Sequence, residues 1–320
     1  MSPDTTMSPE VAKGPDRILV IKLGALGDIA LALGPFKAIR RDHSRAHITL
    51  LTTAAFADFT AASGYFDDVW IDDRPALCQP GRWLGLRKRL RGGGFRRVYD
   101  LQTSDRTGWY FLLMAPGPRP EWSGIAAGCS HPHDNPDRDF MHSIERQDEQ
   151  LAAAGITDVP AADLAWVAAD TARFNLAPRY MLLVPSAASH RPAKRWPAAK
   201  FAELAGRLAG DGVEPAILGG QGDRALANEI KAAAVAIRDL TGLTTIADIA
   251  VLARNAAGAV GNDTGPMHMI AAAGCPSVVL FSADSDPALA APRGPVVTVL
   301  RHDALGDLSI DEVVSALSLR

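Results

Sequence analysis

The sequence lacks the features that mark secreted, membrane-spanning and nucleic-acid-binding proteins. Its three cysteines, Cys78, Cys129 and Cys275, are odd in number and far apart, so they indicate neither a disulfide framework nor a paired-cysteine zinc site. No apolar run approaches the about 20 residues that a membrane-spanning helix needs. The formal net charge of −3 is too small to indicate nucleic acid as the main partner. We therefore expect a cytoplasmic protein that binds no nucleic acid and can meet a membrane only at its surface.

Several motifs of catalysis and metal binding are also missing. There is no G-x-S-x-G elbow and no Walker loop, which argues against an α/β-hydrolase and a P-loop kinase. No regular element fixes the spacing of His131, His133, Asp134 and Asp137, so we assign no metal. Residues 1–16 hold no apolar stretch, which argues against a secretory signal and predicts a disordered lead-in.

The chain of 320 residues alternates strand-like runs with helical spacers, and 48% of its residues are hydrophobic. In the first half, the short apolar runs at 17–22, 47–52, 68–71 and 97–101 predict strands. Ile29, Leu33, Phe36 and Ile39 recur at offsets of four, three and three, which predicts one amphipathic helix after the first strand. This alternation predicts a parallel sheet with helices on both faces.

A second series of the same kind follows. Strands are expected at 180–185, 214–218, 258–261 and 277–281, and helices at 198–209, 224–234, from Pro266 and from Ile310. The fold class is therefore α/β, with two doubly wound domains at 17–172 and 173–320 facing a central cleft. The last helix, from about residue 310, can pack back on the N-terminal domain. The segment Gly117–Asp139, rich in proline, glycine and aspartate, predicts a long irregular loop.

A glycine turn, Gly24 to Asp28, joins the first strand to the first helix. Glycines permit a tight turn, and the helix N-terminus offers free N–H groups and partial positive charge. The turn is not the dinucleotide fingerprint, because only Gly24 and Gly27 are present where three glycines are needed. Asp28 has two interpretations, a carboxylate that stabilises the helix start and a functional carboxylate exposed at the cleft. The local sequence alone favours the first.

A second turn of this kind, Asn262 to His268, follows a strand of the second half. Pro266 at a first helical position and several free N–H groups make an anion site suited to a diphosphate. His268 would lie in the first helical turn, near that anion. The alternative is a capped helix with a partly buried histidine, but the crowding of cap residues, glycine and histidine at one strand end favours a site.

Two basic segments leave their function open. The loop 185–197 offers the hydroxyls of Ser186 and Ser189 and the charges of Lys194 and Arg195, so it can hold phosphate or carboxylate, although a solvated basic loop looks similar. The segment Arg82–Arg97 is basic and contains no acidic residue. It can lie on anionic lipid as a basic amphipathic helix, or it can be a solvated face over a core stripe.

Five motifs in order carry a resemblance to a known family. They are Leu19-Val-Ile-Lys-Leu-Gly-Ala-Leu-Gly-Asp28, Ala193-Lys-Arg-Trp-Pro197, Leu218-Gly-Gly220, Asp239-Leu-Thr-Gly-Leu-Thr244 and 262–268. Together they resemble glycosyltransferase family 9, the ADP-heptose:lipopolysaccharide heptosyltransferases, from about Arg17 nearly to the C-terminus. The resemblance implies a GT-B architecture and inverting transfer of a heptose or related sugar, without a metal or a bound cofactor, from an ADP-sugar donor to an inner-core or lipid A-type acceptor of lipopolysaccharide. It also implies work at the cytoplasmic face of the inner membrane.

The resemblance also implies roles for residues. Asp28 falls on the catalytic aspartate, which accepts the proton of the acceptor hydroxyl. Lys194 falls on the lysine that contacts the donor phosphates. The remaining positions expected at the donor are Gly27, Ser186, Ser189, Arg195, Gln221, Thr244, Asp263, Thr264, Gly265 and His268.

The sequence departs from the family at one donor position and leaves two other functions open. Gln221 stands where some members carry a glutamate that binds the nucleoside ribose. One alternative is a non-catalytic nucleotide-sugar-binding protein of the same fold. The other is an NAD-type oxidoreductase, which needs an acidic ribose partner after the second strand, where Thr52 and Thr53 stand instead.

Overall fold

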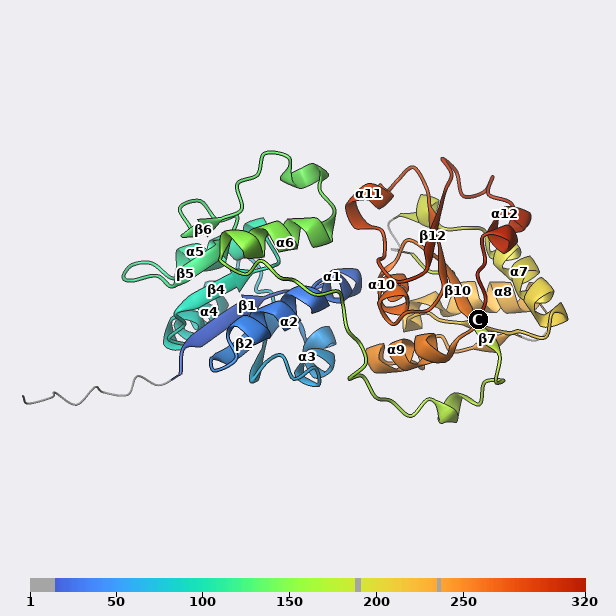
Figure 1. The fold of residues 1–320 in the computed structure, drawn as a ribbon, viewed down its shortest axis with the longest axis horizontal. Coiled ribbons are helices and arrows are strands. Elements are labelled where there is room, and N and C mark those ends of the chain that lie inside the picture. Colours follow the sequence, from blue (N-terminus) through green and yellow to red (C-terminus); the bar gives the residue numbers. More distant parts are fainter. Residues whose placement is uncertain (1–14, 188–190, 235–236) are drawn as a thin grey trace, which may run out of the picture.

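The computed structural model describes residues 15–187, 191–234 and 237–320. They form two halves, each built on a six-stranded sheet, which lie side by side in Figure 1. The strand orders are β3-β2-β1-β4-β5-β6 and β12-β11-β10-β7-β8-β9. All the strand pairs are parallel, as the alternation of strands and helices predicts.

The first half holds the elements up to α6. Its strands are β1 (Arg17–Ile21), β2 (His47–Thr52), β3 (Asp68–Ile71), β4 (Arg97–Asp100), β5 (Glu121–Gly124) and β6 (His131–Pro132). Its helices are α1 (Leu26–Leu31), α2 (Leu33–Asp42), α3 (Ala54–Ala61), α4 (Pro80–Gly92), α5 (Asp105–Leu113), the 3-10 turn η1 (Arg138–Phe140) and α6 (Ser143–Ala153).

The second half begins after a connection of 154–179 that contains η2 (Ala172–Phe174), and the expected domain boundary falls in this connection. Its strands are β7 (Tyr180–Val184), β8 (Glu214–Ile217), β9 (Arg238–Asp239), β10 (Gly258–Asn262), β11 (Ser277–Phe281) and β12 (Val297–Arg301). Its helices are η3 (Pro192–Lys194), α7 (Ala198–Gly210), η4 (Gln221–Asp223), α8 (Arg224–Ala233), α9 (Ile246–Asn255), α10 (Gly265–Ala272), α11 (Pro287–Ala290) and α12 (Ile310–Ser315).

The two halves share one apolar core. It joins Ile29 and Phe36 of the first half to Met267, Met269 and Phe281 of the second. Helices α1 and α10 pack against each other where the halves meet, near the middle of Figure 1. The outer face of each sheet has its own smaller cluster. Because apolar surface is buried between the halves, the carboxyl ends of strands β1 and β10 are brought together.

Some expected elements differ in the structure. The predicted first helix is interrupted at Ala32 and forms α1 and α2, although all four residues of its stripe are buried. The segment Gly117–Asp139 is not wholly irregular, because it contains β5 and β6. Strands β9 and β12 had no predicted counterpart. Helix α12 packs on α7, with Ile310 and Val313 in the core of the second half, and not on the N-terminal half.

The expected lead-in lies mostly outside the described residues, since residues 1–14 are not described. Asp16 departs from the expectation, because its backbone oxygen accepts a hydrogen bond from the N–H of His47 at 2.8 Å. This bond extends the pairing of β1 and β2 by one step, so the ordered chain begins before Arg17.

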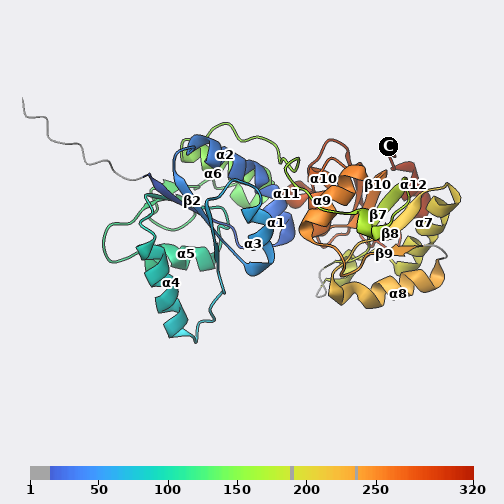
Figure 2. The ribbon, with the colours of Figure 1, turned by 90° about the horizontal axis from the view of Figure 1, so that it is seen from below.

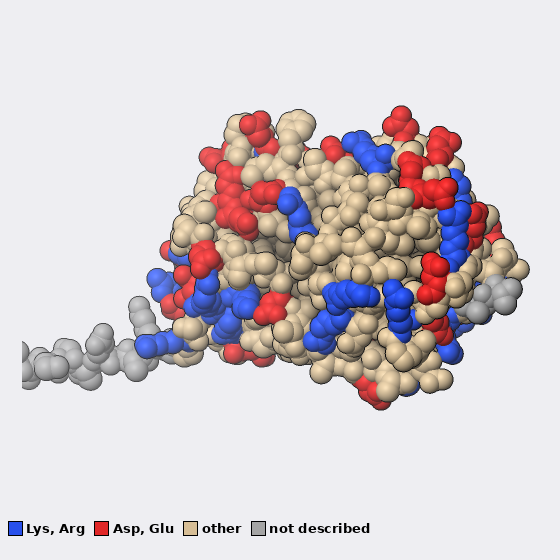
Figure 3. Space-filling view, turned by 45° about the vertical axis from the view of Figure 1, so that its right-hand side comes forward, with Lys and Arg blue, Asp and Glu red and all other residues tan. Residues whose placement is uncertain are grey.

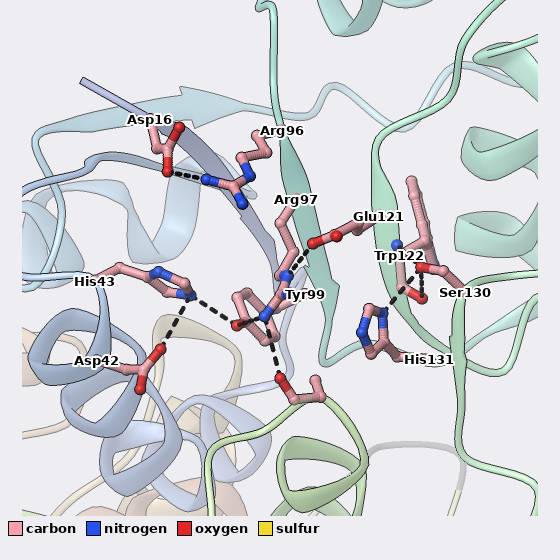
Figure 4. A network of polar contacts seen from close by, with 11 residues as sticks. Asp16, Asp42, His43, Arg96, Arg97, Tyr99, Glu121, Trp122, Ser130 and His131 are labelled. Atoms are coloured by element: carbon pink, nitrogen blue, oxygen red, sulfur yellow. Dashed lines mark hydrogen bonds and ion pairs between the residues drawn. The ribbon is translucent and has the colours of Figure 1, made fainter. Parts of the chain in front are cut away.

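A polar network closes the amino-terminal edge of the first sheet (Figure 4). The Tyr99 hydroxyl lies 2.7 Å from Nε2 of His43 and accepts a hydrogen bond from Arg97 at 3.2 Å. Arg97 also donates to the carboxylate of Glu121 at 2.6 Å. Burial raises the pKa of Tyr99 and lowers the pKa of His43, so both side chains stay neutral near pH 7. The network ties β4 and β5 to α2, at the end of the sheet opposite to the glycine turns.

The surface carries mixed charge. Figure 3 shows acidic and basic side chains interspersed over the face that it presents, around an area of uncharged residues. Among the described residues, no helix is long and apolar enough to cross a membrane. The three cysteines are all free, with Cys78 exposed and the other two buried.

Candidate functional site

The two glycine turns predicted from the sequence touch each other. A Cβ atom on Gly27 would lie 2.9 Å from the ring of His268, and one on Gly265 would lie 2.8 Å from Cβ of Leu26. Contacts this short leave no room for a side chain, so glycine is needed at both positions. The starts of α1 and α10, which are far apart in the sequence, therefore form one site at the carboxyl ends of β1 and β10.

Asp28 stands in the first turn of α1 and is half-buried. Its Oδ2 atom accepts a hydrogen bond from the backbone N–H of Ala25 at 2.8 Å, so Asp28 stabilises the helix start, as the first of its two interpretations predicts. The described residues give Oδ1 no hydrogen bond. One carboxylate oxygen is therefore committed to the turn, and the other is available to a substrate hydroxyl.

Lys194 and Asp263 form a buried ion pair beside α10. Nζ of Lys194 lies 2.6 Å from Oδ2 of Asp263, and each side chain is 11% exposed. Lys194 ends the short helix η3, whereas Asp263 directly follows β10. Thr264 is the N-cap residue of α10, but its side chain accepts no hydrogen bond from the N–H groups that begin this helix. A cation and a helix N-terminus at one place suit a diphosphate.

His268 lies in the first turn of α10 and is buried. Burial lowers its pKa to about 4, although the negative charges of Asp263 and Asp28 oppose the shift. The imidazole is therefore neutral near pH 7 and can donate or accept a hydrogen bond, but it does not supply a positive charge. Its Nδ1 atom has no hydrogen-bond partner among the described residues.

The other expected donor residues lie at the carboxyl ends of neighbouring strands in the second sheet. Ser186 is buried two residues after β7, and Arg195 donates to the backbone oxygen of Ala187 at 3.1 Å. Gln221 follows β8 and is exposed, and it donates to the backbone oxygen of Gly242 at 3.0 Å. Through this bond the turn after β8 meets the turn after β9.

Not all of the expected donor residues are in contact with one another. Thr244 is half-buried, two residues beyond Gly242. Gln221 and Thr244 lie on the turns that follow β8 and β9, at the rim of the second sheet, and neither has a hydrogen bond to the Lys194–Asp263 pair. Ser189 lies outside the described residues, and its position is not assigned.

The sequence interpretation did not select two buried charged residues behind Asp28. Nζ of Lys22 donates to the backbone oxygen of Leu101 at 2.9 Å. Burial lowers the pKa of Lys22, and the negative charges of Asp28 and Asp100 oppose this shift. Burial raises the pKa of Asp100 to about 6, and N–H groups of Thr103 and Gln102 limit the rise. The available signal was a charged residue that ends an apolar strand run, as in Val20-Ile21-Lys22.

Arg138 adds a second cation to this group. It comes from the segment that was predicted to be an irregular loop, and it donates to Oγ1 of Thr103 at 2.6 Å and to Nδ1 of His133 at 3.1 Å. Burial lowers the pKa of Arg138, and the positive charge of Arg146 adds to the shift. The same two arginines also lower the pKa of Lys22. Positive and negative groups are therefore packed together behind Asp28, on the side of the site formed by the first half.

Polar contacts also hold the two halves together along the start of α6. His142 lies within 3.0 Å of the backbone oxygen of Ala291, and Glu145 forms an ion pair with Arg293 at 2.8 Å. Beneath these contacts is a cavity of about 580 Å³, which His268 and Asp148 help to line. Burial raises the pKa of Asp148 to about 6, and the charge of Glu145 adds to the shift.

The described residues contain no cluster of three or more histidines, cysteines, aspartates or glutamates that could hold a metal ion. His131 and His133, which the sequence brings close together, have different partners. His131 contacts Ser130 at 2.9 Å, and His133 contacts Glu149 at 3.3 Å.

Comparison with known proteins gives results for the family and for the fold. The family model for glycosyltransferase family 9 (heptosyltransferase) matches residues 83–309. Lipopolysaccharide heptosyltransferase 2 of Salmonella typhimurium is 35% identical over 115 residues, which are 34% of this chain and 33% of that protein. The match thus spans only about a third of the curated relative.

Several solved structures resemble nearly the whole chain, and two of them illustrate the likeness. The Escherichia coli ADP-heptose lipopolysaccharide heptosyltransferase II aligns with a TM-score of 0.76 at 22% identity, over 94% of this chain and 97% of that one. A glycosyl transferase family 9 protein of Veillonella parvula aligns with a TM-score of 0.81 at 20% identity, over 95% and 97%. These likenesses confirm the expected fold, the GT-B arrangement of two Rossmann-like domains.

Proposed function

Because the chain belongs to glycosyltransferase family 9, the heptosyltransferases, we propose that it transfers a heptose from ADP-heptose to the inner core of lipopolysaccharide. The proposed reaction inverts the anomeric centre and uses no metal. Residues 17–172 are proposed to hold the acceptor and residues 173–320 the donor. The names of the related proteins support ADP-heptose as the donor and lipopolysaccharide as the acceptor, and the geometry of the site supports the roles of the residues.

The observation that carries the proposal is the contact between the two turns. The Asp28 turn and the Asp263–His268 turn abut, with the ring of His268 against Gly27. A carboxylate with a free oxygen is thereby brought to the same place as a helix N-terminus and a lysine. Inverting transfer needs this arrangement, because a base must meet the acceptor hydroxyl while positive charge meets the departing phosphate.

The proposed donor site is the N-terminus of α10 with the side chains around it. Lys194 and the free backbone N–H groups at the start of α10, to which Pro266 contributes none, would hold the diphosphate, and Asp263 would orient the lysine through their ion pair. Thr264, Ser186, Ser189 and Arg195 are proposed to complete the phosphate and sugar contacts. Gln221 and Thr244, on the rim after β8 and β9, are proposed to contact the nucleoside.

In the proposed reaction, the acceptor hydroxyl oxygen attacks the anomeric carbon of the heptose. The hydroxyl proton passes to Oδ1 of Asp28, and the bond between the anomeric carbon and the phosphate oxygen breaks. The electron pair of that bond leaves with ADP, whose developing charge is stabilised by Lys194 and the α10 N-terminus. Neutral His268 contributes a hydrogen bond and no charge.

We propose that the enzyme acts at the cytoplasmic face of the inner membrane, where a lipid-anchored acceptor would be presented. The positive charges of Arg138 and Arg146 on the acceptor side would favour an anionic acceptor. A peripheral contact between the segment Arg82–Arg97 and anionic lipid is part of the same proposal.

Two measurements on the purified protein test the function. A thermal-shift panel of nucleotide sugars should show a selective rise of melting temperature with ADP-heptose, because a ligand that binds only the folded state stabilises it. Release of ADP, followed by a coupled assay, should then require an inner-core acceptor. Binding without acceptor-dependent ADP release would instead indicate a non-catalytic nucleotide-sugar-binding protein. A response to NAD would indicate the oxidoreductase.

A further inference from the structure

Helices α4 and α5 lie on the first half, away from the contact with the second half (Figure 2), and they carry an exposed apolar patch. The patch consists of Leu77, Leu84, Trp109 and Leu112, which are 69%, 63%, 44% and 60% exposed. Together with Trp83 they line one groove. Single exposed apolar residues are ordinary, but four of them gathered from a loop and two helices mark an interaction surface.

Helix α4 buries few of its residues completely, although Trp83 and Leu86 are partly buried against the outer apolar cluster of the first half. It has 13 residues, of which Leu90 alone is buried. By comparison, α7 also has 13 residues and buries six of them. Because burial of an apolar face supplies most of the stability of a helix in a protein, a helix exposed to this extent is suited to a second surface that covers it.

The charge around the patch identifies the kind of surface. Helix α4 contains five basic residues and no acidic one. Arg87, Lys88 and Arg91 follow Leu84 by three, four and seven positions, so they lie on the same side of the helix as Leu84. Among the described residues, Arg82 pairs with Asp73 at 3.2 Å, whereas Lys88 and Arg91 have no acidic partner.

The patch is connected to the catalytic turn. The loop between β3 and α4, which carries Leu77, is fixed by a hydrogen bond from Arg74 to the backbone oxygen of Leu23 at 2.9 Å. Leu23 immediately precedes Gly24 in the turn that leads to Asp28. The start of α5 meets the same loop, since Arg106 donates to the backbone oxygen of Pro75 at 3.3 Å. The patch and the base are therefore on one continuous part of the first half.

We propose that this α4–α5 patch lies on an anionic phospholipid bilayer. Leu77, Leu84, Trp109 and Leu112 would enter the interfacial region, and Lys88 and Arg91 would meet the anionic headgroups. Tryptophan suits this depth because its ring is apolar while its N–H is polar. The inference deepens the proposed function, on which it rests for the lipid-anchored acceptor. It replaces a contact through basic residues alone with one that is both apolar and charged.

Vesicle co-sedimentation of the full-length protein tests the proposal. The wild type should bind vesicles of phosphatidylcholine mixed with phosphatidylglycerol and should bind phosphatidylcholine alone much more weakly. The variant Trp109→Ser/Leu112→Ser should lose binding to both. The variant Lys88→Gln/Arg91→Gln should lose binding only to the anionic vesicles, by about fivefold for each charge removed.

Matched variants act as controls. Leu243 is 55% exposed and lies in the second half, so Leu243→Ser removes a similar apolar group and should leave vesicle binding unchanged. Arg45 is exposed outside the patch, so Arg45→Gln should do the same. Equal binding by all variants would overturn the proposal. So would a concentration-dependent dimer that the patch variants abolish while no protein binds vesicles, because the patch would then join two copies of the chain.

A second assay separates this inference from the proposed function. Transfer to a water-soluble, deacylated inner-core acceptor should have the same rate in the patch variants and in the wild type, because these residues do not form the site. Normal transfer without vesicle binding by the wild type would overturn only the membrane inference. Vesicle binding by a wild type that transfers to no acceptor would contradict only the proposed function.

Discussion

Replacement of Asp28 by asparagine separates the two roles that this residue can have. In the structure, Oδ2 accepts the N–H of Ala25 at 2.8 Å, and the described residues leave Oδ1 free. Asparagine keeps an oxygen for the bond to Ala25 but cannot accept a proton at neutral pH. Alanine removes both the bond and the base. A comparison of Asp28→Asn with Asp28→Ala therefore measures the helix-start role and the catalytic role independently.

The expected magnitudes of the two effects differ widely. Asp28 is the third residue of α1, and its side chain accepts one hydrogen bond from the N–H of the N-cap residue Ala25. Loss of one such bond costs about 0.5–1.5 kcal/mol, so we expect Asp28→Ala to lower the free energy of unfolding by about 1 kcal/mol. Asp28→Asn keeps the bond and loses only the favourable charge near the helix N-terminus, so it should cost about 0.3–1 kcal/mol. Loss of a general base slows turnover by about 10²–10⁴-fold. This corresponds to about 3–5 kcal/mol of activation free energy, and both variants should show it.

Three measurements are needed on the same protein samples. Urea denaturation gives the stability, calorimetry gives the affinity for ADP-heptose, and the release of ADP gives kcat. Both variants should bind the donor nearly as well as the wild type, because Lys194 and the α10 N-terminus remain. If Asp28→Asn turned over at close to the wild-type rate while Asp28→Ala was slow only in proportion to its instability, Asp28 would be a helix-start residue and the base would lie elsewhere.

Three further predictions concern the residues around the start of α10. Lys194→Met should weaken donor binding in calorimetry, and it should destabilise the protein by about 3 kcal/mol because it leaves the carboxylate of Asp263 buried without a partner. The double variant Lys194→Met/Asp263→Asn should be more stable than Lys194→Met but should bind the donor no better. A double variant that is no more stable than the single one would contradict this reasoning. Gly27→Ala would bring Cβ to 2.9 Å from the ring of His268, so the free energy of unfolding should fall by about 1–3 kcal/mol and the melting temperature should fall with it. A Cβ atom on Gly81 would meet no atom within 4 Å, so Gly81→Ala should not lower the melting temperature. The pKa of His268 is lowered from 6.5 to about 4, so the unfolded state binds more protons between these values and stability should fall as the pH falls, by up to about 3 kcal/mol. His268→Gln should flatten this part of the urea-derived stability profile, and an unchanged profile would show that His268 titrates normally in the folded protein.

The secondary structure followed from the sequence where local periodicity and burial agree. The stripe of Ile29, Leu33, Phe36 and Ile39 is buried as predicted, because helical spacing fixes which face meets the core. The break at Ala32 was not predicted, since alanine has no local preference that would end a helix. Strand β6 has only two residues, too few to show a pattern, and its pairing with β5 defines it.

Part of the candidate site could also be predicted from local sequence patterns. Lys194 and Asp263 were both expected at the donor, because each belongs to a motif next to a strand end. That they pair with each other at 2.6 Å could not be predicted, since the residues are far apart in the sequence and come together only through the pairing of β7 with β10. Lys22 and Asp100 were not selected, because a charged residue at the end of a strand does not reveal its burial.

The sequence by itself determined two series of alternating strands and helices, a glycine turn in each, and an ordered set of motifs that indicates the family. Those features depend on local propensity, periodicity and spacing, which are present in the chain before it folds. The tertiary structure alone decided that the Asp28 turn meets the His268 turn, that His268 is neutral, and that α4 stays uncovered. Contact, desolvation and exposure depend on how distant segments pack, and the distances that fix them exist only in the folded chain.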